Sequence, residues 1–366
     1  MFKRKYLEII TSLIALLSFT APTLAADQLA DQTTAAPTTQ LAYQPTSSAS
    51  VTYSFAPSAV HLRHTRPTIA LALGGGGIRG AAHIGVLKVF ERENLPIDFI
   101  AGSSMGAIVG GMYAAGVSVE TLDQMFRDRS LFRAYTPVSD TLKLMTVPTS
   151  MLVRSTKLAM GLKTNLIGLH PSNKIASFVD HHVSPYRRNI EQSEIPFVAV
   201  ATNLLDGKAY ALEHGNLGRA LEASSAIPFY LKPVSIDGKL LVDGALRCNV
   251  PSVQARQSRA DIVISVNVDE ALQEINQTTL QRVTPFGNRV LSIVLAEIDS
   301  HQSESSDVEI CPSLSPMPLY SRSVKDAERA MRAGELAAEN ALPQIRMLLN
   351  SKLAAGHSGE CTLVQY

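Results

Sequence analysis

Two apolar segments, each followed at once by a glycine-rich turn and a helix, limit this chain to few folds. The first segment, Thr68–Leu73, leads into GGGGIRG, after which Ala81–Glu93 carries apolar residues at helical spacing. The second segment, Ile97–Ala101, leads into GSSMG and a helix of small residues, Ala107–Ala115. Strands that are apolar on both faces and alternate with helices are typical of a parallel sheet covered by helices on both sides. The sequence therefore predicts an α/β fold with a mostly parallel central sheet.

Later segments extend this pattern. Four further apolar segments resemble strands, at residues 195–202, 208–213, 240–244 and 261–268. Asp206-Gly207 and Asp237-Gly238 lie between strand-like segments, where Asp-Gly is typical of the tight turn of a β-hairpin. Lys325–Leu349 is predicted to be a helix, which Pro343 is expected to kink or interrupt.

The composition excludes several classes of protein. Apolar residues make up 46% of the 366 residues and charged residues 18%, so a wholly disordered or fibrous chain is excluded. A formal net charge of +1 lacks the basic excess of a nucleic-acid-binding protein. Three cysteines are too few for a disulfide scaffold and too widely spaced for a structural zinc site. Cys311 and Cys361 could pair in an oxidising compartment, leaving Cys248 as a thiol, or all three could remain thiols.

The N-terminus has the layout of a secretory signal. Lys3, Arg4 and Lys5 precede the apolar stretch Ile9–Phe19, and small residues follow up to Ala25. An uncleaved anchor helix is the alternative, but the stretch of 11 residues is shorter than the ~20 needed to span a bilayer. Residues 1–25 are therefore predicted to be a signal peptide, which implies a periplasmic or secreted protein. Residues 26–66 are rich in Thr, Ser, Ala and Pro and are predicted to be a disordered linker.

Cleavage of the signal peptide is directly testable. We expect the native protein to begin near Ala26, because small residues at Thr23 and Ala25 match the recognition pattern of signal peptidase. Mass spectrometry of the N-terminal peptide measures this start. An intact Met1 on protein from the soluble exported fraction would contradict the prediction.

Ser104 is the candidate nucleophile. It is the central residue of Gly102-x-Ser104-x-Gly106, which lies between a predicted strand and a predicted helix. On such a sharp turn a serine hydroxyl projects above the edge of the sheet, and the flanking glycines allow the strained backbone. The alternative is a serine that caps the helix. Ser103 stands in the wrong register of the motif.

The glycine loop has two possible uses. Gly75-x-Gly77-x-x-Gly80 matches the dinucleotide-binding fingerprint and lies correctly between strand and helix. That use requires an acidic residue at the end of the next strand, whereas Asp98 lies near the start of that strand. The favoured alternative is an oxyanion hole made by the backbone N–H groups of the loop. No nucleotide cofactor is therefore expected.

Asp243 is the candidate general base. It follows the apolar strand LLV, at the kind of strand end where α/β active sites collect. A serine–histidine–aspartate triad would need a later histidine, and only His301 and His357 qualify, both in polar segments resembling exposed loops. His83 is expected to be a buried, hydrogen-bonded histidine. A serine–aspartate pair therefore fits the residues best, with burial raising the pKa of the aspartate toward the range of an effective base.

Three motifs together resemble the patatin-like phospholipase family. They are GGGGIRGAAHIGVL, GSSMG and ASSAIPFYLKPVSIDGKLLVDGALRCNVP, in this order, and the resemblance covers about residues 67–269. It implies a three-layer α/β/α fold and a Ser–Asp dyad, with Ser104 as nucleophile and Asp243 as base. It places the oxyanion hole on the loop, with Arg79 in the basic position of the family: Gly75, Gly76, Gly77 and Arg79. Four glycines support the motifs: Gly80, Gly102, Gly106 and Gly244. Ala245 stands where many members have glycine.

The resemblance implies a lipid acyl hydrolase that cleaves carboxylic esters of phospholipids or related lipids, without a metal or cofactor. The same site could serve an acyltransferase, or a non-catalytic lipid-binding effector. Residues 67–269 are predicted to be the catalytic domain, and residues 270–366 a C-terminal extension with a helix packed on it. Thr141–His170 is rich in Leu and Met and is predicted to be a flexible apolar cap, with core packing as the alternative.

Overall fold

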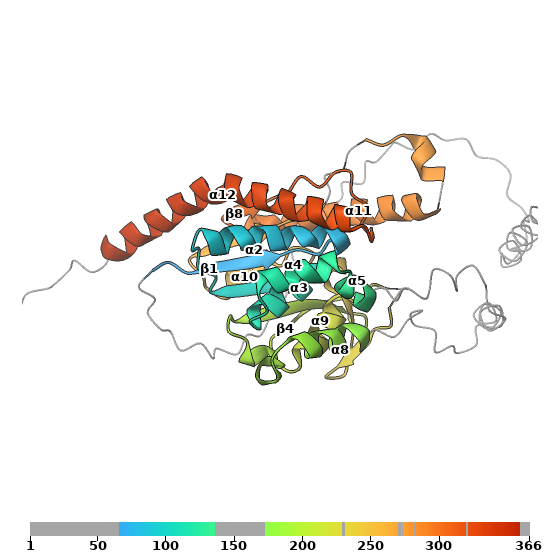
Figure 1. Cartoon of the computed structure of the whole chain (residues 1–366), viewed down its shortest axis with the longest axis horizontal. Coiled ribbons are helices and arrows are strands. Elements are labelled where there is room, and N and C mark those ends of the chain that lie inside the picture. The colour runs from blue at the N-terminus through green and yellow to red at the C-terminus, as the bar shows by residue number, and fades with distance from the viewer. Residues whose placement is uncertain are drawn as a thin grey trace, which may run out of the picture. The chain divides into compact units, whose positions relative to one another are not determined.

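In the computed structural model, eight strands of the described part of the chain form one sheet flanked by helices (Figure 1). The structure describes residues 66–135, 173–228, 231–269, 272, 274–281, 283–319 and 321–358. The strand order is β5-β6-β3-β2-β1-β7-β8, and β4 pairs with β3. The strands are β1 (Ile69–Leu73), β2 (Phe99–Ser103), β3 (Phe197–Asn203), β4 (Ala209–Leu212), β5 (Val234–Ile236), β6 (Lys239–Asp243), β7 (Ile262–Val266) and β8 (Val308–Ile310).

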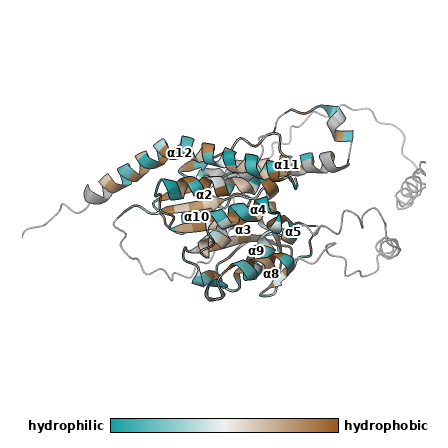
Figure 2. Ribbon diagram, in the orientation of Figure 1, coloured by the Kyte–Doolittle hydropathy of each residue, from teal (hydrophilic) through white to brown (hydrophobic). Residues whose placement is uncertain are grey.

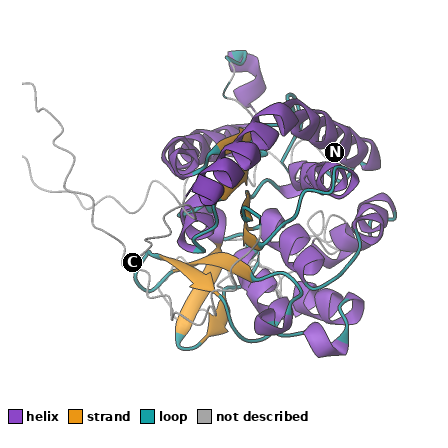
Figure 3. Cartoon of the chain, turned by 90° about the vertical axis from the view of Figure 1, so that its left-hand side faces the viewer, coloured by secondary structure: helices purple, strands orange, loops and turns teal. Residues whose placement is uncertain are grey.

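Helices cover both faces of the sheet (Figure 3). The α-helices are α2 (Ala82–Arg92), α3 (Met105–Ala114), α4 (Val119–Arg127), α5 (Ser130–Tyr135), α8 (Asn173–His182), α9 (Leu217–Ser224), α10 (Ser252–Gln257), α11 (Val283–Gln302) and α12 (Val324–Ser358). Short 3-10 helices are η1 (Gly77–Ala81), η2 (Pro185–Arg187), η3 (Ile190–Gln192), η4 (Gly244–Leu246), η5 (Gln277–Gln281) and η6 (Ser303–Ser305).

The central strand β1 shows why the fold has three layers. All five of its residues are buried, and successive side chains of a strand point to opposite faces of the sheet. Ile69, Leu71 and Leu73 belong to the large core with α2 and α3, whereas Ala70 and Ala72 pack on the other face with Ala255 of α10. The pairs β1–β2, β1–β7, β2–β3 and β7–β8 are parallel. The predicted α/β/α fold with a mostly parallel sheet is confirmed.

Both predicted hairpins are present. β3 and β4 pair antiparallel around Asp206-Gly207, where Gly207 has φ +69°. β5 and β6 pair antiparallel around Asp237 and Gly238, with φ values of 49° and 74°. Asp237 and Gly238 thus form a turn with two successive positive φ values, whose twist matches that of the paired strands. Asp-Gly is typical of this turn.

Strands β2 and β6 meet end to end beside β3. Ala201 of β3 pairs with Tyr210 of β4 and with Asp243 of β6, so β4 and β6 lie on opposite edges of β3. Val200 pairs with β4 and also with Ser103 of β2, so β2 lies on the same edge as β6. Because β6 is antiparallel to β3 while β2 is parallel to it, the C-terminal ends of β2 and β6 face each other.

The C-terminal residues complete the same fold rather than forming a separate unit. β8 extends the sheet beside β7, and α12 packs along α2. A Cβ at Gly85 of α2 would overlap the carbonyl oxygen of Met331, and one at Gly334 of α12 would overlap that of Ala82. Two glycines thus let the two helices approach closely. The predicted domain boundary after Asp269 would cut through the sheet, because β8 lies beyond it.

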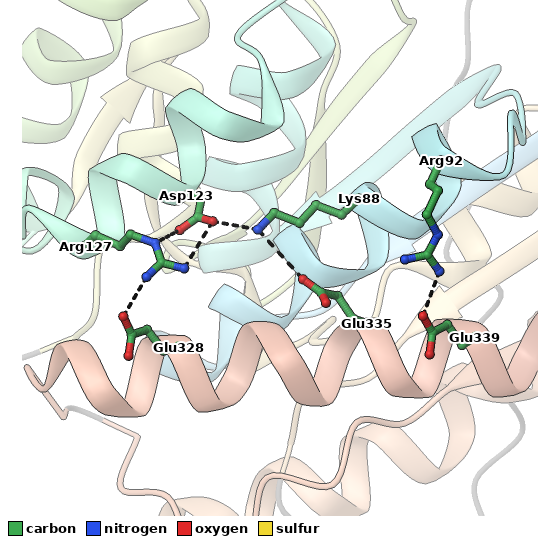
Figure 4. A network of polar contacts seen from close by, with 7 residues as sticks. All are labelled: Lys88, Arg92, Asp123, Arg127, Glu328, Glu335 and Glu339. Atoms are coloured by element: carbon green, nitrogen blue, oxygen red, sulfur yellow. Dashed lines mark hydrogen bonds and ion pairs between the residues drawn. The ribbon is translucent and has the colours of Figure 1, made fainter.

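A network of charged side chains links α12 to α2 and α4 (Figure 4). The carboxylate of Asp123 lies 2.6 Å from Lys88 Nζ and 2.5 Å from Arg127 Nε. Arg127 reaches Glu328 at 2.6 Å, and Arg92 reaches Glu339 at 2.7 Å. Exposed ion pairs contribute little individually, and the buried apolar stripe of α12 supplies most of the packing. Figure 2 shows this helix with alternating polar and apolar patches.

The sequence predicts that Pro343 kinks or interrupts this helix; α12 continues through Pro343, so the interruption does not occur. Several other predictions fall outside the described residues: the signal peptide, most of the linker, the apolar segment Thr141–His170, and Cys361. Within the part of the chain that the structure describes, no helix is both long and apolar enough to cross a membrane.

Candidate active site

Ser104 lies on a strained turn between β2 and α3. Its backbone has φ 52° and ψ −120°, a region that side-chain-bearing residues rarely adopt. Its N–H donates to Ser224 Oγ at 3.0 Å, and Ser224 Oγ in turn donates to the carbonyl of Val200 at 2.6 Å. These hydrogen bonds hold the turn in the strained conformation. The geometry is that of a nucleophile elbow, as the GxSxG motif predicts.

Four glycines allow the elements around this turn to approach one another. At each of them an added Cβ would overlap a neighbouring atom, as the motifs predict for Gly80, Gly102, Gly106 and Gly244. At Gly244 the obstacle is the carbonyl oxygen of Val200 in β3. Glycine at this position therefore allows the chain to leave β6 directly beside the end of β2.

Asp243 meets Ser104 at the junction of β2 and β6. Ser104 Oγ donates to Asp243 Oδ2 at 2.8 Å, and the N–H of Ala245 donates to Asp243 Oδ1 at 3.0 Å. Asp243 is only 6% exposed. Burial raises the pKa of its carboxyl group to about 6, and the two hydrogen bonds oppose this rise. Asp243 ends the strand β6, as the sequence predicts, and because β6 is antiparallel to β3 it reaches Ser104 from the direction opposite to β2.

The glycine loop presents two N–H groups beside Ser104. The N–H of Gly75 donates to the carbonyl of Asn249 at 3.1 Å, so this predicted oxyanion donor is already engaged. Among the described residues, the N–H groups of Gly76 and Gly77 have no hydrogen-bond acceptor. Both residues line a pocket together with Ser104. Of the three backbone N–H groups predicted as oxyanion donors, only those of Gly76 and Gly77 are therefore available to a substrate.

Arg79 is predicted to take part in the oxyanion hole, but it is not among the described residues that line the pocket beside Ser104. Its side chain is 4% exposed, and its Nε donates to the carbonyl of Met317 at 2.8 Å. Its guanidinium also lies 3.6 Å from Asp269 Oδ1. Arg79 thus connects the glycine loop to the segment before α12, because the buried guanidinium needs these acceptors.

The three histidines considered in the sequence analysis lie on helices. His83 is fully buried, its Nε2 lies 2.8 Å from the carbonyl oxygen of Gly74, and burial lowers its pKa to about 4. It is therefore neutral at pH 7, and it is buried and hydrogen-bonded, as predicted; its partner is the glycine loop. His301 and His357 lie in the last turns of α11 and α12 and not in exposed loops as predicted; their side chains are outside the described residues.

The pocket above Ser104 contains about 470 Å³ of open space and is mainly apolar. Its walls come from the glycine loop, the nucleophile turn and distant parts of the chain: Gly76, Gly77, Ser104, Tyr135, Ile227, Pro228, Asp243, Ala245, Leu246, Asn249, Leu295 and Leu319. Leu295 of α11 and Leu319 were not predicted as site residues. No local motif marks them, since they reach the pocket only through packing of the C-terminal segments.

The dinucleotide interpretation requires an acidic group that the structure places elsewhere. Asp98 immediately precedes β2, pairs with Arg66 at 2.8 Å, and accepts a hydrogen bond from the N–H of Ile69. The end of β2 that faces the pocket carries Ser104 instead. Within the described ranges, no three His, Cys, Asp or Glu side chains gather as a metal site.

Comparison with known proteins places this geometry in a family. The model of the family described as patatin-like phospholipase matches residues 71–256, about half of the chain. The chain belongs to the patatin-like phospholipase family. The match contains Ser104, Asp243 and the glycine loop, and ends before α11 and α12. The predicted resemblance is therefore confirmed at the level of the family.

Two relatives illustrate the extent of the similarity. An uncharacterized NTE family protein of Mycobacterium tuberculosis is 36% identical over 217 residues, covering 58% of this chain and 53% of the relative. Patatin-like phospholipase domain-containing protein 6 of Homo sapiens is 32% identical over 251 residues, covering 64% of this chain and 16% of the relative. The chain thus spans about half the length of the mycobacterial relative and a much smaller share of the human one.

Solved structures of low sequence identity are also similar. VipD from Legionella pneumophila has a TM-score of 0.40 at 12% identity, covering 79% of this chain and 67% of VipD. The type III effector protein ExoU has a TM-score of 0.35 at 16% identity, covering 76% of this chain and 53% of ExoU. The family assignment rests on the sequence match and not on these likenesses.

Proposed function

We propose that the protein is a serine hydrolase that cleaves carboxylic esters of lipids through a Ser104–Asp243 dyad. The observation that carries the proposal is the 2.8 Å hydrogen bond from Ser104 Oγ to the buried carboxylate of Asp243, on a strained strand–helix turn. A nucleophilic serine needs a base within hydrogen-bond reach, and this carboxylate meets that requirement. Membership of a phospholipase family supports a lipid as substrate.

In the proposed reaction, Asp243 takes the proton of Ser104 Oγ while that oxygen attacks the ester carbonyl carbon. A pKa of about 6 leaves the carboxylate ionised at neutral pH, yet makes it a better proton acceptor than an ordinary aspartate near 3.9. The alcohol leaves with the proton from Asp243, and the acyl group stays on Ser104 Oγ. Asp243 then deprotonates a water molecule, which attacks the acyl carbonyl carbon. The bond to Ser104 Oγ breaks, Asp243 returns the proton to Ser104 Oγ, and a fatty acid is released.

The negative charge that develops on the carbonyl oxygen is stabilised by the N–H groups of Gly76 and Gly77. Gly76 and Gly77 line the pocket together with Ser104, and their N–H groups have no acceptor within the described parts of the chain. They are held in place before the reaction, because the neighbouring N–H groups of Gly75 and Ile78 are fixed by the carbonyls of Asn249 and Leu319. Preorganised donors of this kind each contribute about 10²–10³ in rate.

The pH dependence of ester hydrolysis tests the proposed base. We expect the purified protein to release fatty acid from phospholipid, and kcat/KM on a soluble ester to fall about tenfold per pH unit below about pH 6. The reason is that protonated Asp243 cannot accept the proton of Ser104. A pH–rate profile in buffers of matched ionic strength measures this. An acidic limb near pH 4, or no release of fatty acid from any lipid ester, would contradict the proposal.

A further inference from the structure

A second pocket adjoins the catalytic one. It contains about 270 Å³ of open space and shares Gly77, Tyr135 and Leu319 with the pocket above Ser104. Its remaining wall combines three apolar and two polar residues: Ile78, Met105, Phe132, Ser321 and Arg322. A ligand bound at Ser104 and the loop of Gly77 therefore has direct access to this second space.

Among the residues that the structure describes, Arg322 is the only charged one that lines this second pocket. Its side chain is exposed, and within the described residues it makes no hydrogen bond or ion pair. Neighbouring arginines differ in this respect. Arg79 donates to the carbonyl of Met317, and Arg329 donates to that of Pro316 at 2.6 Å. Arg322 therefore offers all its donors to a ligand.

The segment that carries Arg322 is fixed to the glycine loop. The N–H of Ile78 donates to the carbonyl of Leu319 at 3.1 Å, and Ser321 Oγ donates to Asp326 Oδ2 in the first turn of α12 at 2.5 Å. A Cβ at Gly77 would overlap the carbonyl oxygen of Leu319, so the two segments are in close contact. The backbone at Arg322 thus keeps a set position relative to the oxyanion donors.

We propose that this second pocket binds the phosphate group of a lipid whose ester carbonyl lies at Ser104, and that Arg322 pairs with that phosphate. A guanidinium presents several N–H groups in one plane and binds phosphate through two parallel hydrogen bonds. The apolar lining residues Ile78, Met105 and Phe132 suit the first methylenes of the same lipid. The inference deepens the proposed function, on which it rests, by making the substrate a phospholipid or lysophospholipid.

Binding to a variant without turnover tests the assignment. In full-length protein carrying Ser104→Ala, affinities are measured by titration calorimetry for lysophosphatidylcholine and for monoacylglycerol of the same acyl chain, both below micellar concentrations. We expect Arg322→Gln to weaken lysophosphatidylcholine about tenfold, a loss typical of one charge-assisted contact, and to leave monoacylglycerol unchanged. Arg322→Lys should retain part of the affinity, because lysine binds phosphate as a point charge.

The matched control is Arg332→Gln, at an exposed arginine of α12 that lines neither pocket. We expect it to change neither affinity, and thermal melts show that each variant is folded. Equal losses for both lipids, no loss for either, or no binding of either lipid overturn the proposal. Inorganic phosphate that binds as tightly as lysophosphatidylcholine assigns the site to free phosphate and also overturns it. Because turnover is absent, a failure of hydrolysis by the wild type contradicts only the proposed function.

Discussion

Replacing Ser104 with alanine is expected to abolish ester hydrolysis and covalent labelling by a fluorophosphonate. In the proposed mechanism the oxygen of this hydroxyl attacks the ester, so its removal leaves only the stabilisation that the oxyanion donors and the pocket provide. Loss of a serine nucleophile of this kind lowers kcat by about 10⁴-fold or more. Steady-state kinetics on a soluble ester and intact-protein mass spectrometry after labelling measure the two effects.

Ser103→Ala is the matched control for this variant. Ser103 is the neighbouring residue and fully buried, and among the described residues its Oγ has no hydrogen-bond partner. Removal of a buried hydroxyl without a partner costs little stability, so the fold should persist. We expect activity within a few-fold of the wild type. Labelling that survives Ser104→Ala but is lost in Ser103→Ala would mean that Ser103, and not Ser104, is the nucleophile.

The parts of the fold that the sequence predicts are those governed by neighbouring residues. The strand–turn–helix units around Gly74–Gly80 and Gly102–Gly106 follow from apolar periodicity and glycine, and both form as predicted. The two Asp-Gly hairpins follow from turn geometry alone. Ser104 and the glycine loop could be recognised because each lies in one of these local units.

The direction from which Asp243 reaches Ser104 could not be predicted in this way. It depends on which edge of β3 pairs with β6, and that choice is made by contacts between residues far apart in sequence. The segment before α12 shows the same limitation. The carbonyls of Met317 and Leu319 bind Arg79 and Ile78, although no motif in that segment indicates contact with the glycine loop.

The engaged N–H of Gly75 is a third case. Its acceptor, the carbonyl of Asn249, belongs to the segment after β6, so the loop motif alone gives three equivalent donors. Only the assembled structure distinguishes Gly75 from Gly76 and Gly77. The same assembly explains the buried His83, whose Nε2 contacts the carbonyl of Gly74 from the following helix.

Asp243→Asn is expected to lower kcat/KM by about 10²–10⁴-fold at pH 7, the usual contribution of a general base. Asparagine keeps the shape of the side chain, and its amide oxygen can still accept the N–H of Ala245. It cannot accept the proton of Ser104. The acidic limb of the pH–rate profile should disappear together with most of the activity. Wild-type activity in this variant would exclude Asp243 as the base and require another acceptor.

The same substitution is expected to make the protein more stable at neutral pH. The pKa of Asp243 is about 6 in the folded protein, against 3.8 for the ordinary carboxyl group. Between these values the folded state binds more protons than the unfolded state, so the carboxyl group lowers stability as the pH rises. Two pKa units correspond to about 3 kcal/mol, fully expressed above pH 7 and absent below about pH 3.8.

Chemical denaturation of the wild type and of Asp243→Asn at several pH values measures this difference. The variant should gain up to about 3 kcal/mol at pH 7 to 8, and the gain should vanish as the pH falls through 6 toward 4. Asparagine does not titrate, so the pH dependence of the difference belongs to Asp243 alone. A variant that is less stable than the wild type at pH 8 would mean that the ionised carboxylate stabilises the fold. In that case burial does not control its pKa, and the acidic limb of activity would lie well below pH 6.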